Sequence, residues 1–462
     1  MNRSKQLEEE SIGKLLMKFS IPAIIGMLVN ALYNIVDRIF IGKGIGSIGI
    51  AGIAVGYPVA LILMAFSMLI GLGANALISI RLGQKREKDA ELILGNAMTS
   101  LIVISAIISV LGLIFLEPIL TLFGASKNVL PYSLDYMRII LIGAPFQAVG
   151  FGMNNFIRGE GNPKIAMATM LIGAILNTIL DPIFIFSFNM GIKGAAYATI
   201  LSQAVSAIWV LSYFLGGNSL LKIRKENLKI QSNIIKEIIT IGLAPFSMQI
   251  AASMVTVLLN NNLKNYGGDI AISAMGTINS ITMLILMPIF GINQGSQPII
   301  GYNYGAKNYD RVKKALKLAI LFATCIVTAG FIIIQTIPAK LISLFVKKSE
   351  VEMIQVASKG IRIYLSMLPV IGFQIVSSNY FQATGKPKQS MLLSLSRQVL
   401  ILIPALLIMP KLFGLKGVWM ASPVSDLISS IITAIFLIND IKHLDTESSK
   451  TTPNRRTIKG SY

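Results

Sequence analysis

The sequence predicts an all-α membrane protein in which twelve transmembrane helices form two six-helix lobes related by an internal repeat. Three observations lead to this prediction. Of the 462 residues, 54% are apolar and only 13% are charged, whereas a soluble domain carries about 25% charged residues. Apolar stretches long enough to cross a bilayer, about 20 residues each, recur from end to end. The two halves of the chain also match one another at an offset of 222 to 224 positions.

The apolar stretches define the twelve predicted spans in order. They cover residues 13–41, 50–80, 93–116, 132–157, 164–188, 194–216, 235–263, 270–302, 314–345, 353–382, 389–410 and 415–441. We therefore expect an N-terminal lobe at 1–217, a cytoplasmic linker at 218–234, a C-terminal lobe at 235–442 and a cytoplasmic tail at 443–462.

The distribution of basic residues predicts the orientation of these spans. If both termini face the cytoplasm, the inner segments and the adjoining span ends hold 27 of the 41 Lys and Arg residues, and the outer segments hold nine. Cytoplasmic loops of membrane proteins carry such an excess of positive charge. We therefore expect a multi-pass protein of the cell membrane with both termini in the cytoplasm.

The internal repeat is visible in short motifs. The stretch GEGNPK at 159–164 matches ATGKPK at 383–388, and GLGANALISIRLGQKREKDA in the first half matches NQGSQPIIGYNYGAKNYDRV in the second. Six spans per half place both copies in the same orientation, which is a parallel repeat of the kind found in transporters. Proline removes a helical hydrogen bond and allows bending, so we predict hinges at Pro22 and Pro182.

The composition excludes several classes of function. The one cysteine, Cys325, cannot form an intramolecular disulfide, and the one histidine, His443, lies in the polar tail. A histidine-based catalytic group or a Cys/His metal site therefore cannot be assembled within the membrane. We expect neither an enzyme nor a cofactor. The net charge of +20 reflects basic residues that flank the spans, so we expect no nucleic-acid partner.

Two intramembrane carboxylates fall at one predicted depth. Asp37 lies about five residues and Asp181 about seven residues below the outer ends of spans one and five, and Thr199 lies about five residues deep in span six. A charged side chain in hydrocarbon costs about 2.5 kcal/mol or more, so such residues usually face a cavity or a partner. Asn177 lies one helical turn from Asp181, and Pro182 leaves the carbonyl of Thr178 without its helical donor.

These groups are hard oxygen ligands, which suit Na⁺ or protons. The sequence therefore predicts a cation or proton site in the N-terminal half. The alternative is that Asp37 pairs with Arg38 or another intramembrane base and only holds helices together. A third acid, Asp426, lies mid-span at the depth of Arg397, and we expect those two residues to form a structural ion pair.

Four stretches carry a resemblance to a known family. They are ALYNIVDRIFIG, NQGSQPIIGYNYGAKNYDRV, GEGNPKIAMATMLIGAILNTILDPIFIF and GIKGAAYATILSQ. With the repeat of six plus six spans, they make the chain similar over almost its whole length to the multidrug and toxic-compound extrusion (MATE) family, nearest its prokaryotic DinF- and MepA-like branch. The resemblance implies a V-shaped pair of lobes and export driven by a gradient of Na⁺ or H⁺.

The resemblance also implies a set of site residues. The cation or proton site of this branch corresponds here to Asp37, Asp181, Asn177 and Thr199, with Asn154 from span four and Asn30 replacing a glutamine in span one. Pro22 corresponds to the bending proline of span one. The second half has Asn260 where the first has Asp37 and has Pro404 near the counterpart of Asp181, so we expect coupling to reside in the first half.

The function predicted is therefore efflux of amphipathic, often cationic organic compounds by alternating access in the lipid bilayer, with H⁺ or Na⁺ as the coupling ion. We expect the protein to act as a monomer. Methionines such as Met153 and Met283 could supply adaptable walls for drug-like substrates, although helix packing is the more common role of any single methionine. The alternative is a flippase for lipid-linked oligosaccharides, which would need several basic groups in its cavity.

Overall fold

The computed structural model describes residues 3–451 except 46, 124, 126, 218 and 346–350, and this part of the chain contains helices and no strands. In the N-terminal half they are α1 (Arg3–Glu9), α2 (Ile12–Gly44), α3 (Ser47–Gly83), α4 (Glu87–Ile114), α5 (Leu116–Leu122), α6 (Leu130–Gly159), α7 (Pro163–Pro182), the π-helix η1 (Ile183–Ser187) and α8 (Gly191–Leu215). The C-terminal half contains α9 (Ser232–Gly305), α10 (Tyr309–Thr336), α11 (Pro338–Ile342), α12 (Val351–Tyr364), α13 (Leu368–Ala383), α14 (Pro387–Leu395), the π-helix η3 (Ser396–Leu402) and α15 (Ile403–Thr451). A 3₁₀-helix, η2 (Lys225–Leu228), lies between the two halves.

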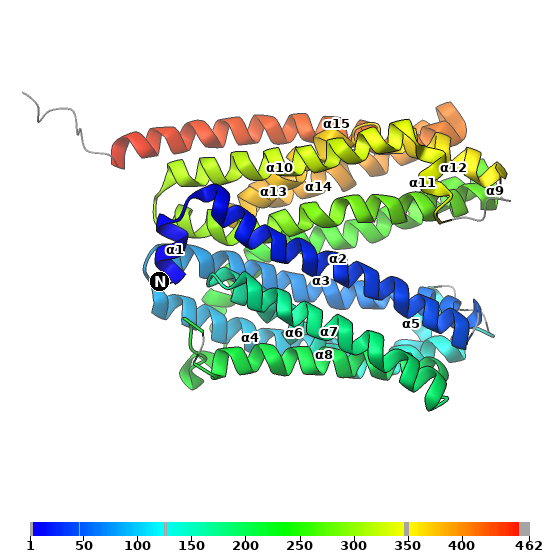
Figure 1. Ribbon diagram of the computed structural model, residues 1–462, viewed down its shortest axis with the longest axis horizontal. Coiled ribbons are helices and arrows are strands. Elements are labelled where there is room, and N and C mark those ends of the chain that lie inside the picture. The colour runs from blue at the N-terminus through cyan, green and yellow to red at the C-terminus, as the bar shows by residue number, and fades with distance from the viewer. Residues whose placement is uncertain are drawn as a thin grey trace, which may run out of the picture.

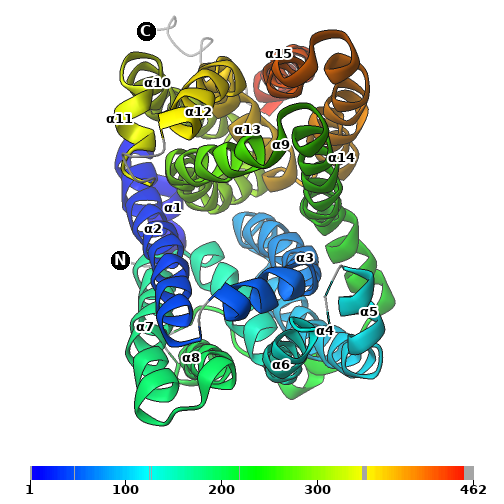
Figure 2. The same cartoon turned by 90° about the vertical axis from the view of Figure 1, so that its right-hand side faces the viewer.

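The helices form two groups that lie side by side. Figure 1 shows α9, α10 and α12 to α15 in one group and α3 to α8 in the other, all running roughly along the long axis of the molecule, and α2 crosses from the first group to the second. Figure 2 shows the same two groups from one end. The N-terminus and the C-terminal end of α15 lie at the opposite end, together with residues 219–231, which belong to the connection between the two groups along the chain. We call that end the linker end, and the end that faces the viewer in Figure 2 the far end.

The long helices amount to twelve membrane spans. Ten helical stretches in the described part are long and apolar enough to cross a membrane, or up to eleven if the bent pair α12 and α13, which meet at 52°, is one span. The stretch Pro387–Thr446 is 60 residues long, about three times what a bilayer needs. Its helix breaks at Gly414, where φ is 56°, and the break divides it into two spans. The predicted all-α fold of twelve spans is confirmed.

The repeat predicted from sequence recurs in the turns between helices. Six of the nine described backbone positions with positive φ form pairs: Lys85 with Lys307, Gly161 with Gly385, and Gly191 with Gly414. The pairs are separated by 222, 224 and 223 positions, the offsets at which the two halves match. Left-handed backbone conformations are uncommon outside glycine, so their recurrence at these offsets shows that the two halves share their turn geometry.

α15 shows how a membrane helix divides its faces. Ile428, Ile431, Ile435 and Ile438 are each 41% to 55% exposed, whereas Asp426, Ser429 and Thr433 on the same helix are buried. Apolar side chains on the outer surface suit lipid, and hydroxyls and charged groups turn toward neighbouring helices, where they find hydrogen-bond partners. Polar groups inside the bundle therefore mark helix contacts and candidate sites.

The two groups of helices meet closely near the linker end. A methyl group at Gly83 of α3 would overlap the carbonyl oxygen of Tyr302, and one at Gly305 of α9 would overlap the carbonyl oxygen of Ile80. These two contacts are repeat counterparts, because 83 and 305, like 80 and 302, are 222 positions apart. Glycine permits such close approach of two backbones. The contact therefore lies on the axis that relates the two halves.

One hydrogen bond also joins the halves across this axis. Asn75 Nδ2 donates to Gln297 Oε1 at 2.9 Å, and the two side chains are both buried. They too are separated by 222 positions. Glycine contacts and a buried amide pair together hold the halves closed at the linker end.

We expect Gly83→Ala to open this contact, because its methyl group must displace backbone rather than a flexible side chain. Gly276→Ala is the control, since a methyl group there meets nothing within 4 Å. The measurement is maleimide labelling of Ser79→Cys, a buried position beside the contact, in a Cys325→Ser background. Labelling should be several-fold faster with Gly83→Ala than with Gly276→Ala. Equal rates would show that the halves do not pivot at this contact.

Two buried carboxylates fasten the linker to the N-terminal half. Glu160 accepts hydrogen bonds from the hydroxyl of Tyr213, from Ser219 Oγ at 2.6 Å and from the backbone N–H of Leu220 at 3.0 Å. Glu91 of α4 accepts from Arg224 Nε at 2.6 Å and from the backbone of residue 222 at 3.1 Å. The linker is therefore bound along the linker end of α4 and α6.

The segment before α2 crosses in the other direction. Arg311 of α10 donates to the carbonyl oxygens of Leu7 at 3.0 Å and of Glu10 at 2.7 Å, and Asn303 donates to Leu7 at 3.2 Å. The Leu7 side chain is buried. The N-terminal segment thus rests on the C-terminal half at the linker end.

Candidate functional site

Asp181 lies at the far end of α7, where the helix changes its hydrogen bonding. Pro182 ends α7 and has no N–H to donate to the carbonyl of Thr178. The N–H of Ile183 donates to the carbonyl of Leu180, and the π-helix η1 follows. π-helical turns within α-helices often occur at functional sites. The Asp181 side chain at this irregular point is fully buried.

Asn177 connects Asp181 to α8. Its Nδ2 lies 3.4 Å from Asp181 Oδ1 and 3.5 Å from Thr199 Oγ1. The Thr199 hydroxyl donates to the carbonyl of Ala195 at 3.0 Å, so its lone pairs accept from the amide. The other atom of the amide, Asn177 Oδ1, is buried and accepts no hydrogen bond within the described structure. A buried oxygen without a donor is rare in proteins and points to a missing proton donor or cation.

Asp37 and Tyr136 complete the group. The carboxyl groups of Asp37, from α2, and Asp181 lie close enough to interact electrostatically. The Tyr136 hydroxyl, from α6, lies near Thr199 and both acids. Four helices of the N-terminal half thus bring together one cluster, which we call the Asp181 cluster: Asp37, Tyr136, Asn177, Asp181 and Thr199. The side chain of Arg38, the alternative partner of Asp37, lies outside the described part of the structure.

The chemistry of the Asp181 cluster suits a small hard cation. Two charged carboxylates repel in a low-dielectric interior, and neutralising one of them relieves the repulsion. In the described chain, no group of three or more His, Cys, Asp or Glu residues is placed to hold a metal ion. The donors that are present are carboxylate, amide and hydroxyl oxygens. A proton, or a Na⁺ ion held by these oxygens, would each supply the missing positive charge.

The structure does not bring every predicted residue into this cluster. Asn154 is buried on α6, five residues or about 8 Å from its linker end, whereas Asn177 lies fourteen residues or about 21 Å along α7. The two amides therefore lie about 13 Å apart in depth, and Asn154 is outside the Asp181 cluster in this state. Asn30 lies two turns before Asp37 on α2, and its side chain is exposed.

Pro22 lies where α2 passes from one half of the molecule to the other. The helix is continuous through it from Ile12 to Gly44. Just beyond the proline, Ile24 packs against Gly291 of the C-terminal half, and Gly26 packs against Met170 of α7. A hinge at this position would change the angle between the two contacts, and it stays a prediction.

Tyr136 was missed by the reasoning from sequence. It lies seven residues into α6, which begins at Leu130 near the far end, so its depth matches that of Thr199. Its polar hydroxyl at this depth is the signal in the sequence that points to the cluster. Depth alone does not say which side of a helix a residue faces.

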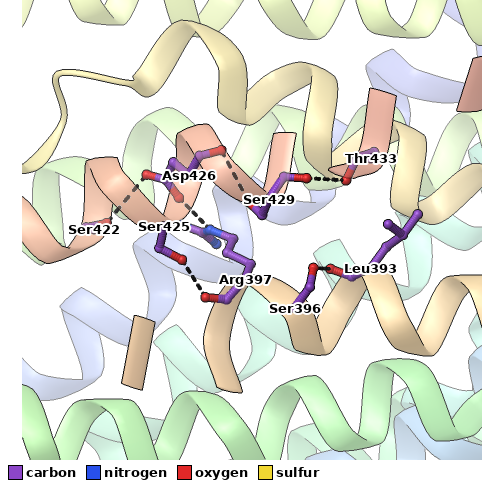
Figure 3. Close-up of polar contacts among 8 residues, drawn as sticks. All are labelled: Leu393, Ser396, Arg397, Ser422, Ser425, Asp426, Ser429 and Thr433. Atoms are coloured by element: carbon purple, nitrogen blue, oxygen red, sulfur yellow. Dashed lines mark hydrogen bonds and ion pairs between the residues drawn. The ribbon is translucent and has the colours of Figure 1, made fainter. Parts of the chain in front are cut away.

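Arg397 and Asp426 form the ion pair that the sequence predicts. Arg397 Nε lies 2.6 Å from Asp426 Oδ1, and the Asp426 side chain is 1% exposed. Figure 3 shows the serines around them: Ser422 Oγ lies 3.5 Å from Asp426 Oδ2, and Ser425 Oγ donates to the carbonyl of Arg397 at 2.5 Å. Both residues have polar partners within the bundle, so the predicted structural ion pair is confirmed.

The methionines divide between core and surface. Met153 is fully buried among apolar side chains of the N-terminal half, whereas Met283 of α9 is 50% exposed. Met153 therefore belongs to helix packing and not to a substrate wall. Asn260, the counterpart of Asp37, is exposed on α9.

Comparisons with known proteins agree with this architecture. The sequence model of the MatE family matches residues 22–183 and again 244–407. The chain is 30% identical over 444 residues to the multidrug export protein MepA of Staphylococcus haemolyticus (strain JCSC1435). This alignment covers 94% of this chain and 95% of that protein. MepA of Staphylococcus aureus (strain MSSA476) is 29% identical over 441 residues, 95% of this chain and 97% of that protein.

Solved structures extend the agreement to three dimensions. The MATE multidrug transporter DinF-BH superimposes with a TM-score of 0.87 at 40% identity and covers 94% of this chain and 96% of its own. A MOP superfamily transporter from Pyrococcus furiosus superimposes with a TM-score of 0.90 at 26% identity, over 95% and 98% of the two chains. Two matched copies and agreement over the full length leave one interpretation: the chain belongs to the MatE family, whose members are membrane transporters and not enzymes.

Proposed function

We propose that this protein exports amphipathic, often cationic organic compounds from the cell, in exchange for H⁺ or Na⁺ that binds at the Asp181 cluster. The observation that supports coupling most directly is the pair of carboxyl groups, half-buried Asp37 and fully buried Asp181, beside the unsatisfied oxygen of Asn177. Such a pair is costly inside a membrane bundle. It is useful where a cation must bind and leave.

The substrate class is supported by the relatives. MepA is a multidrug export protein, and DinF-BH is a multidrug transporter. The flippase alternative receives less support, because Arg397, one of the few intramembrane bases, already pairs with Asp426. A pyrophosphate group could not pair with Arg397, because Asp426 already neutralises its charge.

The proposed orientation places the linker end in the cytoplasm. Most of the basic residues lie in segments that reach this end, as the excess of 27 over nine requires. Because the halves touch near the linker end, the arrangement corresponds to a state closed toward the cytoplasm. We propose that the protein works as a monomer in the cell membrane.

The proposed cycle is an exchange at one lobe. A proton or Na⁺ enters the Asp181 cluster from outside and neutralises the paired acids. α2 can then bend near Pro22, which alters its contacts with α7 and α9 and expels the compound. Substrate and cation favour different shapes of the same lobe, so each weakens the binding of the other.

The test is transport by the purified protein in liposomes with an imposed gradient. A fluorescent organic cation should move against its concentration gradient when either a pH gradient or a Na⁺ gradient is imposed, and an ionophore that collapses that gradient should stop the movement. Comparing the two gradients identifies the coupling ion. If neither gradient drives an organic cation while lipid-linked pyrophosphates cross the bilayer, the protein is a flippase instead.

A further inference from the structure

We infer that the C-terminal half carries a latent cation site, the counterpart of the Asp181 cluster, in which the guanidinium of Arg397 permanently occupies the place of the exchangeable cation. The inference rests on the proposed function in one respect: it takes the Asp181 cluster as the site of the exchangeable cation. It predicts that removing Arg397 creates a second binding site for a free cation.

The two clusters occupy equivalent helices. α8 begins at Gly191 and the last span begins at Gly414, both with left-handed backbones of φ 55° and φ 56°. Each glycine opens the same motif, GIKG in the first half and GLKG in the second. Counted from these glycines, Ser422 stands at the position of Thr199, eight residues along in each case.

The hydroxyls at these two positions have the same kind of partner. Thr199 lies near Tyr136 of α6, the fourth span. Ser422 lies near Tyr364 of α12, which begins the tenth span. Spans four and ten are repeat counterparts, so a tyrosine from the equivalent helix meets the equivalent hydroxyl in both halves.

The third helix of each cluster is irregular in both halves. The fifth span contains the π-helix η1 directly after Asp181 and Pro182. The eleventh span contains the π-helix η3, and Arg397 is its second residue. A π-turn leaves backbone groups without their α-helical hydrogen-bond partners. In the second half, Ser425 Oγ donates a hydrogen bond to the carbonyl of Arg397, which lies in this π-turn.

The two clusters differ in charge. The first half gathers two carboxyl groups, whose repulsion a proton or Na⁺ can relieve. The second half gathers one carboxylate, Asp426, and one guanidinium 2.6 Å away, with Ser422 on the second carboxylate oxygen. A guanidinium stays protonated in proteins, and this one is tethered to its helix. The second cluster is therefore complete without any ion from solution.

This difference confines the response to the gradient to one lobe. Neither external cation can displace a covalently attached one at Asp426, so the second cluster keeps its shape when pH or Na⁺ changes. The first lobe alone then rearranges against a fixed partner. Sequence differences between the lobes thus assign them different roles on the same framework.

The experiment removes the tethered cation in a protein whose first site is already disabled. The background is Asp37→Asn/Asp181→Asn in the full-length chain, purified in detergent, with the melting temperature measured against pH and against Na⁺. Adding Arg397→Gln should make the melting temperature rise by a few degrees with acid pH or with Na⁺. For one bound proton, the unfolding equilibrium changes by up to about tenfold per pH unit. Arg138→Gln is the matched control, since that membrane arginine is exposed, and it should add no such dependence.

The carboxylate provides the second control. Adding Asp426→Asn to the Arg397→Gln variant should remove the new dependence, because no charge is left to neutralise. A variant with Arg397→Gln that responds to neither ion would overturn the inference, as would one that cannot be recovered folded at any pH or Na⁺ concentration while the Arg397→Gln/Asp426→Asn variant folds. The proposed function is judged separately: if the background variant keeps the ion response of the unmodified protein, the assignment of the Asp181 cluster is wrong whatever Arg397→Gln does.

Discussion

Replacing Asp181 with asparagine should reduce gradient-driven export to the rate of liposomes without protein, while the variant remains folded. The side chain is fully buried and interacts directly with Asp37 and Asn177. Asparagine has nearly the same shape, so packing is kept. The variant keeps only one of the two titrating carboxyl groups at the cluster. Cation binding there can then no longer link the gradient to the shape of the lobe.

The control for this variant is another acid near the same end of the bundle. Asp135 adjoins Tyr136 in sequence, but its side chain is 39% exposed and forms a 3.4 Å ion pair with Lys193. Asp135→Asn should therefore transport at nearly the normal rate. The measurement is uptake of a fluorescent cation into proteoliposomes at matched protein density, with the melting temperature recorded for each variant. Normal export by Asp181→Asn would remove the cluster from the mechanism.

The second large effect concerns substrate affinity. In detergent, the affinity of the unmodified protein for an organic cation should fall as pH drops or as Na⁺ rises, because the neutralised cluster favours the shape that releases substrate. Asp37→Asn should make the affinity insensitive to both ions, since the pair of acids no longer exists. Asn260→Ala, at the equivalent position of the second half, should leave both dependences in place. An affinity of the unmodified protein that stays flat across pH and Na⁺ would rule out the exchange.

A substitution at Asn177 distinguishes Na⁺ from H⁺ as the coupling ion in the same affinity measurement. Asn177 Oδ1 is a buried oxygen without a hydrogen-bond donor in the described structure. Amide oxygens are ligands of the kind that Na⁺ prefers, whereas a proton binds to a carboxyl group itself. In Asn177→Ala, the Na⁺ concentration that lowers substrate affinity should therefore rise about tenfold or more, if one ligand is worth about 1.4 kcal/mol. The dependence of substrate affinity on pH should stay unchanged. Loss of both effects together would show that the amide instead positions Asp181.

The helices and their pairing by repeat follow from the sequence because a bilayer imposes simple rules. Spans must be apolar and about 20 residues long, so composition alone locates them. Turn residues with positive φ, such as Lys85 and Lys307, recur at the offset visible in the sequence. Asn177 and Asp181 are four residues apart on one helix, and this spacing places them on the same face before any tertiary contact forms.

Depth along a helix could also be counted from sequence, since each residue rises about 1.5 Å. That count brought Asp37, Asp181 and Thr199 to one level, and it showed Asn154 to be deep, as the structure finds. A count cannot fix the rotation of a helix about its axis. Tyr136 lies at the right level and also faces the cluster, and only the packing of α6 against α8 decides the second point.

Contacts between distant segments depended wholly on the tertiary structure. Nothing local indicates that Glu160 holds the linker through Ser219 and Leu220, or that Asn75 meets Gln297 across the axis. The proximity of Arg397 and Asp426 could be suggested from depth, but their 2.6 Å contact needs two helices turned toward each other. The sequence determined which helices form, how they repeat and how deep each polar group lies; the packing of the helices decided which of those groups meet, because depth is set within one helix and facing is set between two.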